Sequence, residues 1–138
     1  MSTTLLLRVA AVLTAIQGIV HGGFFISAKP RSEAETAMVT AMKTGLFFGG
    51  GTRGYWDMYF GYGLIAAAIC LVEAVLLWQV ARIAVVPPTL ARPIVVLLLA
   101  WKVAHALVVW RYFAFPIPIA FDALVAACLA WWLLAQPR

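Results

Sequence analysis

The chain contains four long apolar runs, each bounded by charged, glycine or proline residues. An α-helix rises about 1.5 Å per residue, so roughly 20 residues cross the hydrocarbon of a bilayer, which is about 30 Å thick. Four such runs predict an all-α integral membrane protein: a four-helix bundle forming a single domain over residues 1–138. The predicted spans are residues 9–28, 55–81, 93–112 and 117–135.

The composition also places the chain in a membrane. Hydrophobic residues make up 65% of it and charged residues 11%, whereas a soluble domain has about 45–50% and about 25%. Lipid is therefore the expected partner of most of the surface. The basic residues give a net charge of +5 but stand singly at the ends of the runs, so they predict no nucleic-acid partner.

Several enzyme classes are excluded by their missing motifs. The sequence has no P-loop, dinucleotide-binding fingerprint, H-E-x-x-H motif or serine elbow. The two cysteines, Cys70 and Cys128, lie far apart inside apolar runs, which is not a zinc or redox pattern. The sequence therefore predicts no metal site and no bound cofactor.

The first loop contains a predicted short helix. Ser32 and Glu35 have the spacing of a capping box, in which each side chain satisfies a backbone N–H group at the start of a helix. We expect an amphipathic helix over residues 33–43, which either lies on the membrane surface or caps the bundle.

Prolines and aromatic residues mark the ends of the spans. Pro87, Pro88 and Pro93 are expected to break the connection before the third span, and Pro118 fits the first turn of the fourth. Tryptophan and tyrosine concentrate at membrane interfaces, and we expect Trp78, Trp131 and Trp132 in one such belt. An even number of spans puts both termini on one side. We expect that side to be the cytoplasm and the membrane to be a bacterial inner membrane.

Polar residues inside the spans fall at matching depths. By the helical rise, His21 and His105 each lie about 10 Å below the surface opposite the termini, and Asp57 and Asp122 are near the same end. Glu73 and Lys102 lie deeper, about 12 and 14 Å from the other surface, and this match predicts an ion pair.

These positions suggest a site for a lipophilic small molecule, where histidine and carboxylate groups exchange protons with it. The enzyme would be an isomerase, cyclase or hydrolase. The candidate catalytic residues are His21, His105, Asp57 and Glu73, either histidine acting as acid or base with Asp57 or Glu73 as its partner. The candidate substrate-binding residues are Gln17, Trp56, Tyr59, Tyr62, Trp101, Lys102 and Asp122.

Each position also has a purely structural interpretation. His21 would bridge two helices by a hydrogen bond, and the Glu73–Lys102 pair would fix the helix register. Asp57 would pair with Arg53 at the surface. Asp122 would stabilise the dipole at the start of its helix.

Residues 54–64, GYWDMYFGYGL, together with residues 111–119, RYFAFPIPI, resemble a group of small, uncharacterised bacterial four-helix membrane proteins. Gly18-Ile19-Val20-His21 resembles, more faintly, a motif of the EXPERA superfamily, which includes the emopamil-binding sterol isomerases. That family has an acid four residues after the histidine, where this chain has Phe25. The resemblance implies a lipophilic pocket lined by a histidine and a few acids.

Three other functions remain open from the sequence. A non-catalytic accessory or scaffold subunit of a larger membrane complex is the main alternative, since the chain is small, its loops are short, and a G-x-x-x-G motif at Gly18 and Gly22 favours close helix packing. A haem held between His21 and His105 is a second. The third is a transporter that works as a homodimer with Glu73 as a proton-coupled site.

Overall fold

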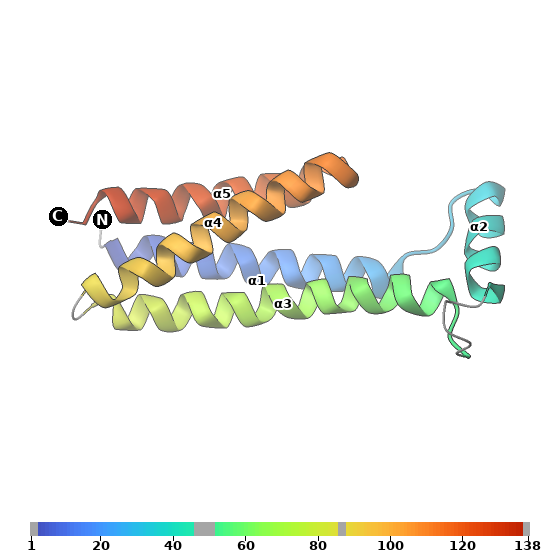
Figure 1. Cartoon of the computed structure of the whole chain (residues 1–138), viewed down its shortest axis with the longest axis horizontal. Coiled ribbons are helices and arrows are strands. Elements are labelled where there is room, and N and C mark those ends of the chain that lie inside the picture. The colour runs from blue at the N-terminus through green and yellow to red at the C-terminus, as the bar shows by residue number, and fades with distance from the viewer. Residues whose placement is uncertain (1–2, 46–51, 86–87, 137–138) are drawn as a thin grey trace. The chain divides into compact units, whose positions relative to one another are not determined.

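The structure is a computed structural model, and it describes residues 3–45, 52–85 and 88–136. Within these ranges every regular element is a helix, as Figure 1 shows. The five helices are α1 (Thr3–Ser27), α2 (Glu33–Thr44), α3 (Tyr55–Ile83), α4 (Pro88–Tyr112) and α5 (Pro116–Leu134). The all-α prediction is therefore confirmed.

Four of the described helices are long and apolar enough to cross a membrane, namely Thr4–Ser27, Tyr55–Ile83, Thr89–Tyr112 and Pro116–Leu134. Large hydrophobic side chains are exposed along all four of them. A surface of this kind is stable in lipid and costly in water. The four predicted spans therefore correspond to four helices of a candidate multi-pass membrane protein.

Two helices begin earlier than the sequence predicts. α1 begins at Thr3 and includes Arg8, because a long basic side chain extends away from the helix to a polar level without ending it. α4 begins at Pro88 and continues through Pro93, so the expected break at Pro93 is wrong. Pro93 lies only in the second turn, where its missing N–H group removes a single helical hydrogen bond. Pro87 lies outside the described residues.

The short helix of the first loop is present as α2. The Ser32 side chain accepts a hydrogen bond from the Glu35 N–H group at 3.1 Å. The Glu35 carboxylate in turn accepts from the Arg31 N–H group at 2.5 Å. The predicted N-cap is confirmed, and the reciprocal bond reaches one residue further back than the usual capping box. No residue of α2 is buried.

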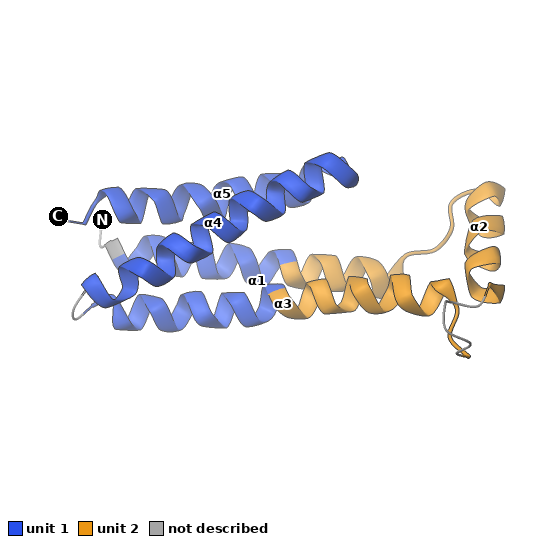
Figure 2. Ribbon diagram, in the orientation of Figure 1, with its two compact units in different colours: residues 1–17, 70–138 blue, residues 18–69 orange. Residues whose placement is uncertain are grey.

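The chain divides into two compact units, coloured separately in Figure 2. Unit 1 comprises residues 1–17 and 70–138, and unit 2 comprises residues 18–69. The boundary falls inside α1 and α3, so each of these helices contributes to both units. Unit 1 thus contains parts of four spanning helices, and unit 2 contains parts of two with α2.

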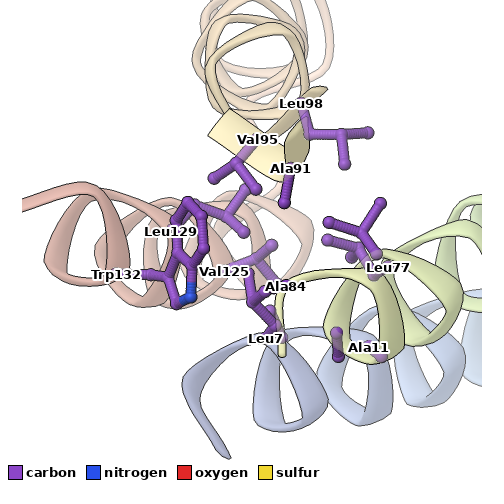
Figure 3. Packing of buried hydrophobic residues seen from close by; sticks show 13 residues of the cluster. Leu7, Ala11, Leu77, Ala84, Ala91, Val95, Leu98, Val125, Leu129 and Trp132 are labelled. Atoms are coloured by element: carbon purple, nitrogen blue, oxygen red, sulfur yellow. The ribbon is translucent and has the colours of Figure 1, made fainter. Parts of the chain in front are cut away.

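Unit 1 has an apolar core. Its buried residues come from α1, α3, α4 and α5 and from Ala84 beside the end of α3. Figure 3 shows Trp132 of α5 beside Leu129 and Val125 of the same helix. Trp132 is 0% exposed while Trp131 is 69% exposed. Trp131 thus has the exposure expected of a belt residue, whereas Trp132 is a core residue.

A three-residue turn joins α4 and α5 and ends at Pro116. The N–H groups of Phe113 and Ala114 both donate to the Val109 carbonyl at 2.9 Å. Ala114 has a φ of 51°, a left-handed conformation that residues with a side chain seldom adopt. Pro118 then falls in the first turn of α5, as predicted.

Unit 2 packs its two helices through small residues. The ring of Phe25 lies directly on Gly63, where an added Cβ atom would be 2.4 Å from two ring carbons. An added Cβ at Gly22 would be 3.3 Å from the Cβ of Ala67. Glycine and alanine therefore let α1 and α3 approach closely in this unit.

Candidate functional site

Five polar side chains of the spans in unit 1 converge on one cluster, which we call the polar cluster. It is built by four helices: α1, α3, α4 and α5. Its members are Gln17, Glu73, Lys102, His105 and Asp122. Four of them are at least 94% buried, and only the His105 side chain, 31% exposed, reaches the surface.

Lys102 is the centre of charge in the polar cluster. Its Nζ atom lies 3.0 Å from Oε2 of Glu73 and 3.5 Å from Oδ1 of Asp122. The ion pair predicted between Glu73 and Lys102 is therefore present. Neither carboxylate oxygen of Glu73 has a well-aligned hydrogen bond within the described residues, so the pair is held by charge more than by hydrogen-bond geometry.

Asp122 connects the histidine to this pair. Its Oδ2 atom lies 2.6 Å from Nδ1 of His105, and its Oδ1 atom accepts a hydrogen bond from Nε2 of Gln17 at 3.3 Å. With an ionised Asp122, the His105 Nδ1 atom carries the proton, and this N–H group donates a hydrogen bond to the carboxylate. In a neutral imidazole the other nitrogen, Nε2, is then the basic one.

The charges of the polar cluster do not cancel. In their ionised forms Glu73 and Asp122 would provide two negative charges and Lys102 one positive charge, which leaves one net negative charge beside a neutral His105. A buried charge is costly in a membrane unless it is paired. A proton on His105 would balance the cluster.

The carboxylate partner of the histidine differs from the prediction. Asp57 or Glu73 was expected in that role, and Asp122 occupies it for His105. Asp57 is exposed in the first turn of α3, in unit 2, and accepts a hydrogen bond from the Gly54 N–H group at 2.9 Å. The expected pairing of Asp57 with Arg53 is thus replaced by a contact that stabilises the helix start.

The interpretation of Asp122 as an acid at the helix start is also wrong. It is the seventh residue of α5, and the first turn of that helix contains no acid. The effect of the helix dipole fades within the first turn. Asp122 is 0% exposed. It contacts Lys102, His105 and Gln17, so its partners are the other members of the polar cluster.

His21 lies in unit 2, whereas His105 lies in unit 1. The His21 ring is 5.0 Å from that of Phe25, which is 5.2 Å from Tyr59. The ring of Trp56 lies 5.8 Å from the ring of Tyr59. The Nζ atom of Lys43 lies 5.1 Å from the centre of the Trp56 ring. His21, Tyr59 and Trp56 therefore belong to an aromatic cluster of unit 2.

Two further predicted binding residues are exposed. Tyr62 in unit 2 is 67% exposed, on the outer face of α3. Trp101 in unit 1 is 45% exposed, and its ring lies 6.0 Å from the ring of His105. Trp101 therefore flanks the one member of the polar cluster that reaches the surface.

Two hollows on the described chain are shallow surface depressions. One is lined by residues between 30 and 37 and the other by residues between 127 and 135. Neither includes a member of the polar cluster. In the part of the chain that the structure describes, no three histidine, cysteine or acidic residues are grouped so that they would hold a metal ion.

The pairing of His105 with Asp122 has a signal in the sequence. His105 lies eight residues before Phe113 and Asp122 seven residues after Phe115, on either side of the α4–α5 turn. In antiparallel helices joined by a short turn, residues equally distant from the turn lie at the same level.

No family model matches the chain, and neither a curated protein nor a solved structure matches it.

Proposed function

We propose that the chain is a multi-pass protein of a bacterial inner membrane with both termini in the cytoplasm. The four apolar helices and their exposed hydrophobic side chains support the membrane location. The bacterial origin rests on the resemblance of residues 54–64 and 111–119 to small bacterial membrane proteins.

We propose that the polar cluster is an intramembrane proton-transfer site for a lipophilic small molecule. The observation that carries the proposal is the 2.6 Å contact between the buried Asp122 and the partly exposed His105. A carboxylate on Nδ1 fixes the tautomer and orientation of an imidazole, and Nε2 is left to exchange a proton with a reactant. His105 is the candidate acid and base.

The other members position this pair. Lys102 and Gln17 both contact Oδ1 of Asp122, so its second oxygen is directed to His105. Glu73 offsets the charge of Lys102. Trp101 provides an apolar ring beside the imidazole, against which a lipophilic molecule would pack. These four are positioning or binding residues, and only His105 would touch the reacting atom.

The reaction class that fits best is an isomerisation. His105 Nε2 would remove a proton from one carbon of an unsaturated lipophile, and the imidazolium would return that proton to another carbon as the double bond moves. No atom is gained or lost and no co-reactant is needed. The imidazolium would be paired with Asp122 while it exists.

Native mass spectrometry of the gently solubilised protein tests whether a ligand is bound, and the released molecule can be identified. That molecule is then incubated with the protein in deuterated buffer. Wild-type protein should incorporate deuterium into the ligand, because a proton held on His105 exchanges with solvent. His105→Gln should lose at least tenfold of this rate, since a positioned acid or base contributes about 10²–10⁴-fold.

His21→Gln is the matched control, because it makes the same substitution at the other histidine, which lies in unit 2. It should exchange at the wild-type rate. A ligand-free mass, or exchange that survives in His105→Gln, would refute the proposal.

A non-catalytic accessory subunit is the second candidate. It is favoured by one observation: the charged groups of the polar cluster contact one another. A closed network of this kind also serves to fix helix register. This function predicts a second chain, or a second copy, in the native mass spectrum and no small molecule.

A further inference from the structure

The exposed charged residues among the described residues of unit 1 are all positively charged. Within its described residues they are Arg8, Arg82, Arg92 and Arg111. The only acids of this unit, Glu73 and Asp122, are buried and paired in the polar cluster. No exposed carboxylate of the described residues of unit 1 offsets the arginines, so its surface attracts anions.

Three of these arginines lie at one end of unit 1. Arg8 is near the start of α1, Arg82 is in the last turn of α3, and Arg92 is in the second turn of α4. Figure 2 shows that the start of α1, the end of α3 and the start of α4 meet at the same end of this unit. We call Arg8, Arg82 and Arg92 the arginine end.

Trp78 marks the level of the arginine end. The guanidinium carbon of Arg8 lies 5.7 Å from the centre of the Trp78 ring, and Trp78 is 46% exposed. Arg82 is one turn further along α3 and its Nη1 atom donates to Oε1 of Gln79 at 3.3 Å. An exposed tryptophan beneath an arginine is typical of the headgroup level of a bilayer.

We propose that the arginine end binds the phosphate groups of anionic phospholipids. A guanidinium group matches phosphate by paired hydrogen bonds, and it does so better than an ammonium group. Three arginines from three helices would hold phosphates at the rim of one helix bundle. The occupant is a lipid because four apolar helices place this end against a headgroup layer. This inference does not depend on the proton-transfer site.

The first experiment uses unmodified protein. It is exchanged into nanodiscs of equal parts phosphatidylglycerol and phosphatidylcholine, and the lipids that remain bound in native mass spectrometry are counted. We expect phosphatidylglycerol to be retained several-fold over phosphatidylcholine. Equal retention of the two lipids would overturn the proposal, as would displacement of phosphatidylglycerol by excess inorganic phosphate.

Variants then locate the site. Each arginine near an anionic surface contributes about fivefold to binding, so Arg8→Gln, Arg82→Gln and Arg92→Gln combined should abolish the preference for phosphatidylglycerol. Arg111→Gln, at the opposite end of α4, is the control and should keep the preference. Circular dichroism confirms that each variant is folded. A triple variant that is folded and keeps the full preference would refute the assignment to the arginine end.

Discussion

Unit 1 and unit 2 share α1 and α3, yet their interiors differ in kind. All the buried polar or charged side chains of the described residues lie in unit 1, together with the apolar core of thirteen residues. Unit 2 has Ala67 as its one buried hydrophobic residue among those described, and a phenylalanine ring set on a glycine. One pair of helices therefore supports two kinds of packing.

The difference shows what each unit needs from its sequence. Unit 1 has to keep charges paired away from water, so the identity of its polar residues matters most. Unit 2 depends on a close steric fit, so the size of a few small residues matters most. Substitutions in the two units should consequently fail for different reasons.

The largest effect is expected from Asp122→Ala. It removes the carboxylate shared by Lys102, His105 and Gln17, and losing one partner of a buried charge pair costs about 3–5 kcal/mol. The measurement is unfolding in mild detergent, followed by circular dichroism. Asp57→Ala in unit 2 removes one exposed contact with the Gly54 N–H group and should cost about 1 kcal/mol. Equal losses would break the distinction between the units.

A smaller effect is expected from Gly63→Ala in unit 2. The new Cβ atom would meet the Phe25 ring at 2.4 Å, and overpacking of this kind costs about 1–3 kcal/mol. Gly61→Ala is the matched control, because nothing lies within 4 Å of a Cβ atom added there. Thermal unfolding of both variants checks the prediction. Further, the Gly63→Ala cost should shrink when Phe25 is also replaced by alanine.

The smallest effect is expected from Ser32→Ala, which sharpens the comparison within unit 2. Loss of the cap bond to the Glu35 N–H group should cost α2 about 1 kcal/mol. Hydrogen–deuterium exchange should speed up in α2 and stay unchanged in α5. Thr40→Ala, whose hydroxyl bonds only to the Thr36 carbonyl of its own helix, should leave the exchange of α2 nearly unaltered. The same exchange in both variants would argue against the cap.

Much of the fold is readable from the sequence because it depends on position along the chain. The apolar runs define the four spanning helices, and Ser32 with Glu35 defines the start of α2. The depth of Glu73 and Lys102 predicts their ion pair, because the rise per residue of a helix is fixed.

The remaining features depend on rotation about the helix axis. Trp131 and Trp132 are adjacent in the sequence, yet one is exposed and the other is fully buried. A helix that is apolar all round does not indicate which face packs against protein and which against lipid. The partner of His105 was missed for a different reason: depth alone does not separate Asp122 from Asp57, whereas distance from the α4–α5 turn does.

The length of the three-residue turn between α4 and α5 determines how His105 and Asp122 of unit 1 are aligned. It sets His105 and Asp122 at nearly equal distances from the bend, eight residues before Phe113 and seven after Phe115. One inserted residue would rotate Asp122 by about 100° and shift it by about 1.5 Å relative to α4, so the carboxylate would leave both His105 and Lys102. Connecting segments usually tolerate changes in length. In this chain the turn is expected to be less tolerant of insertion than the helix ends that it joins.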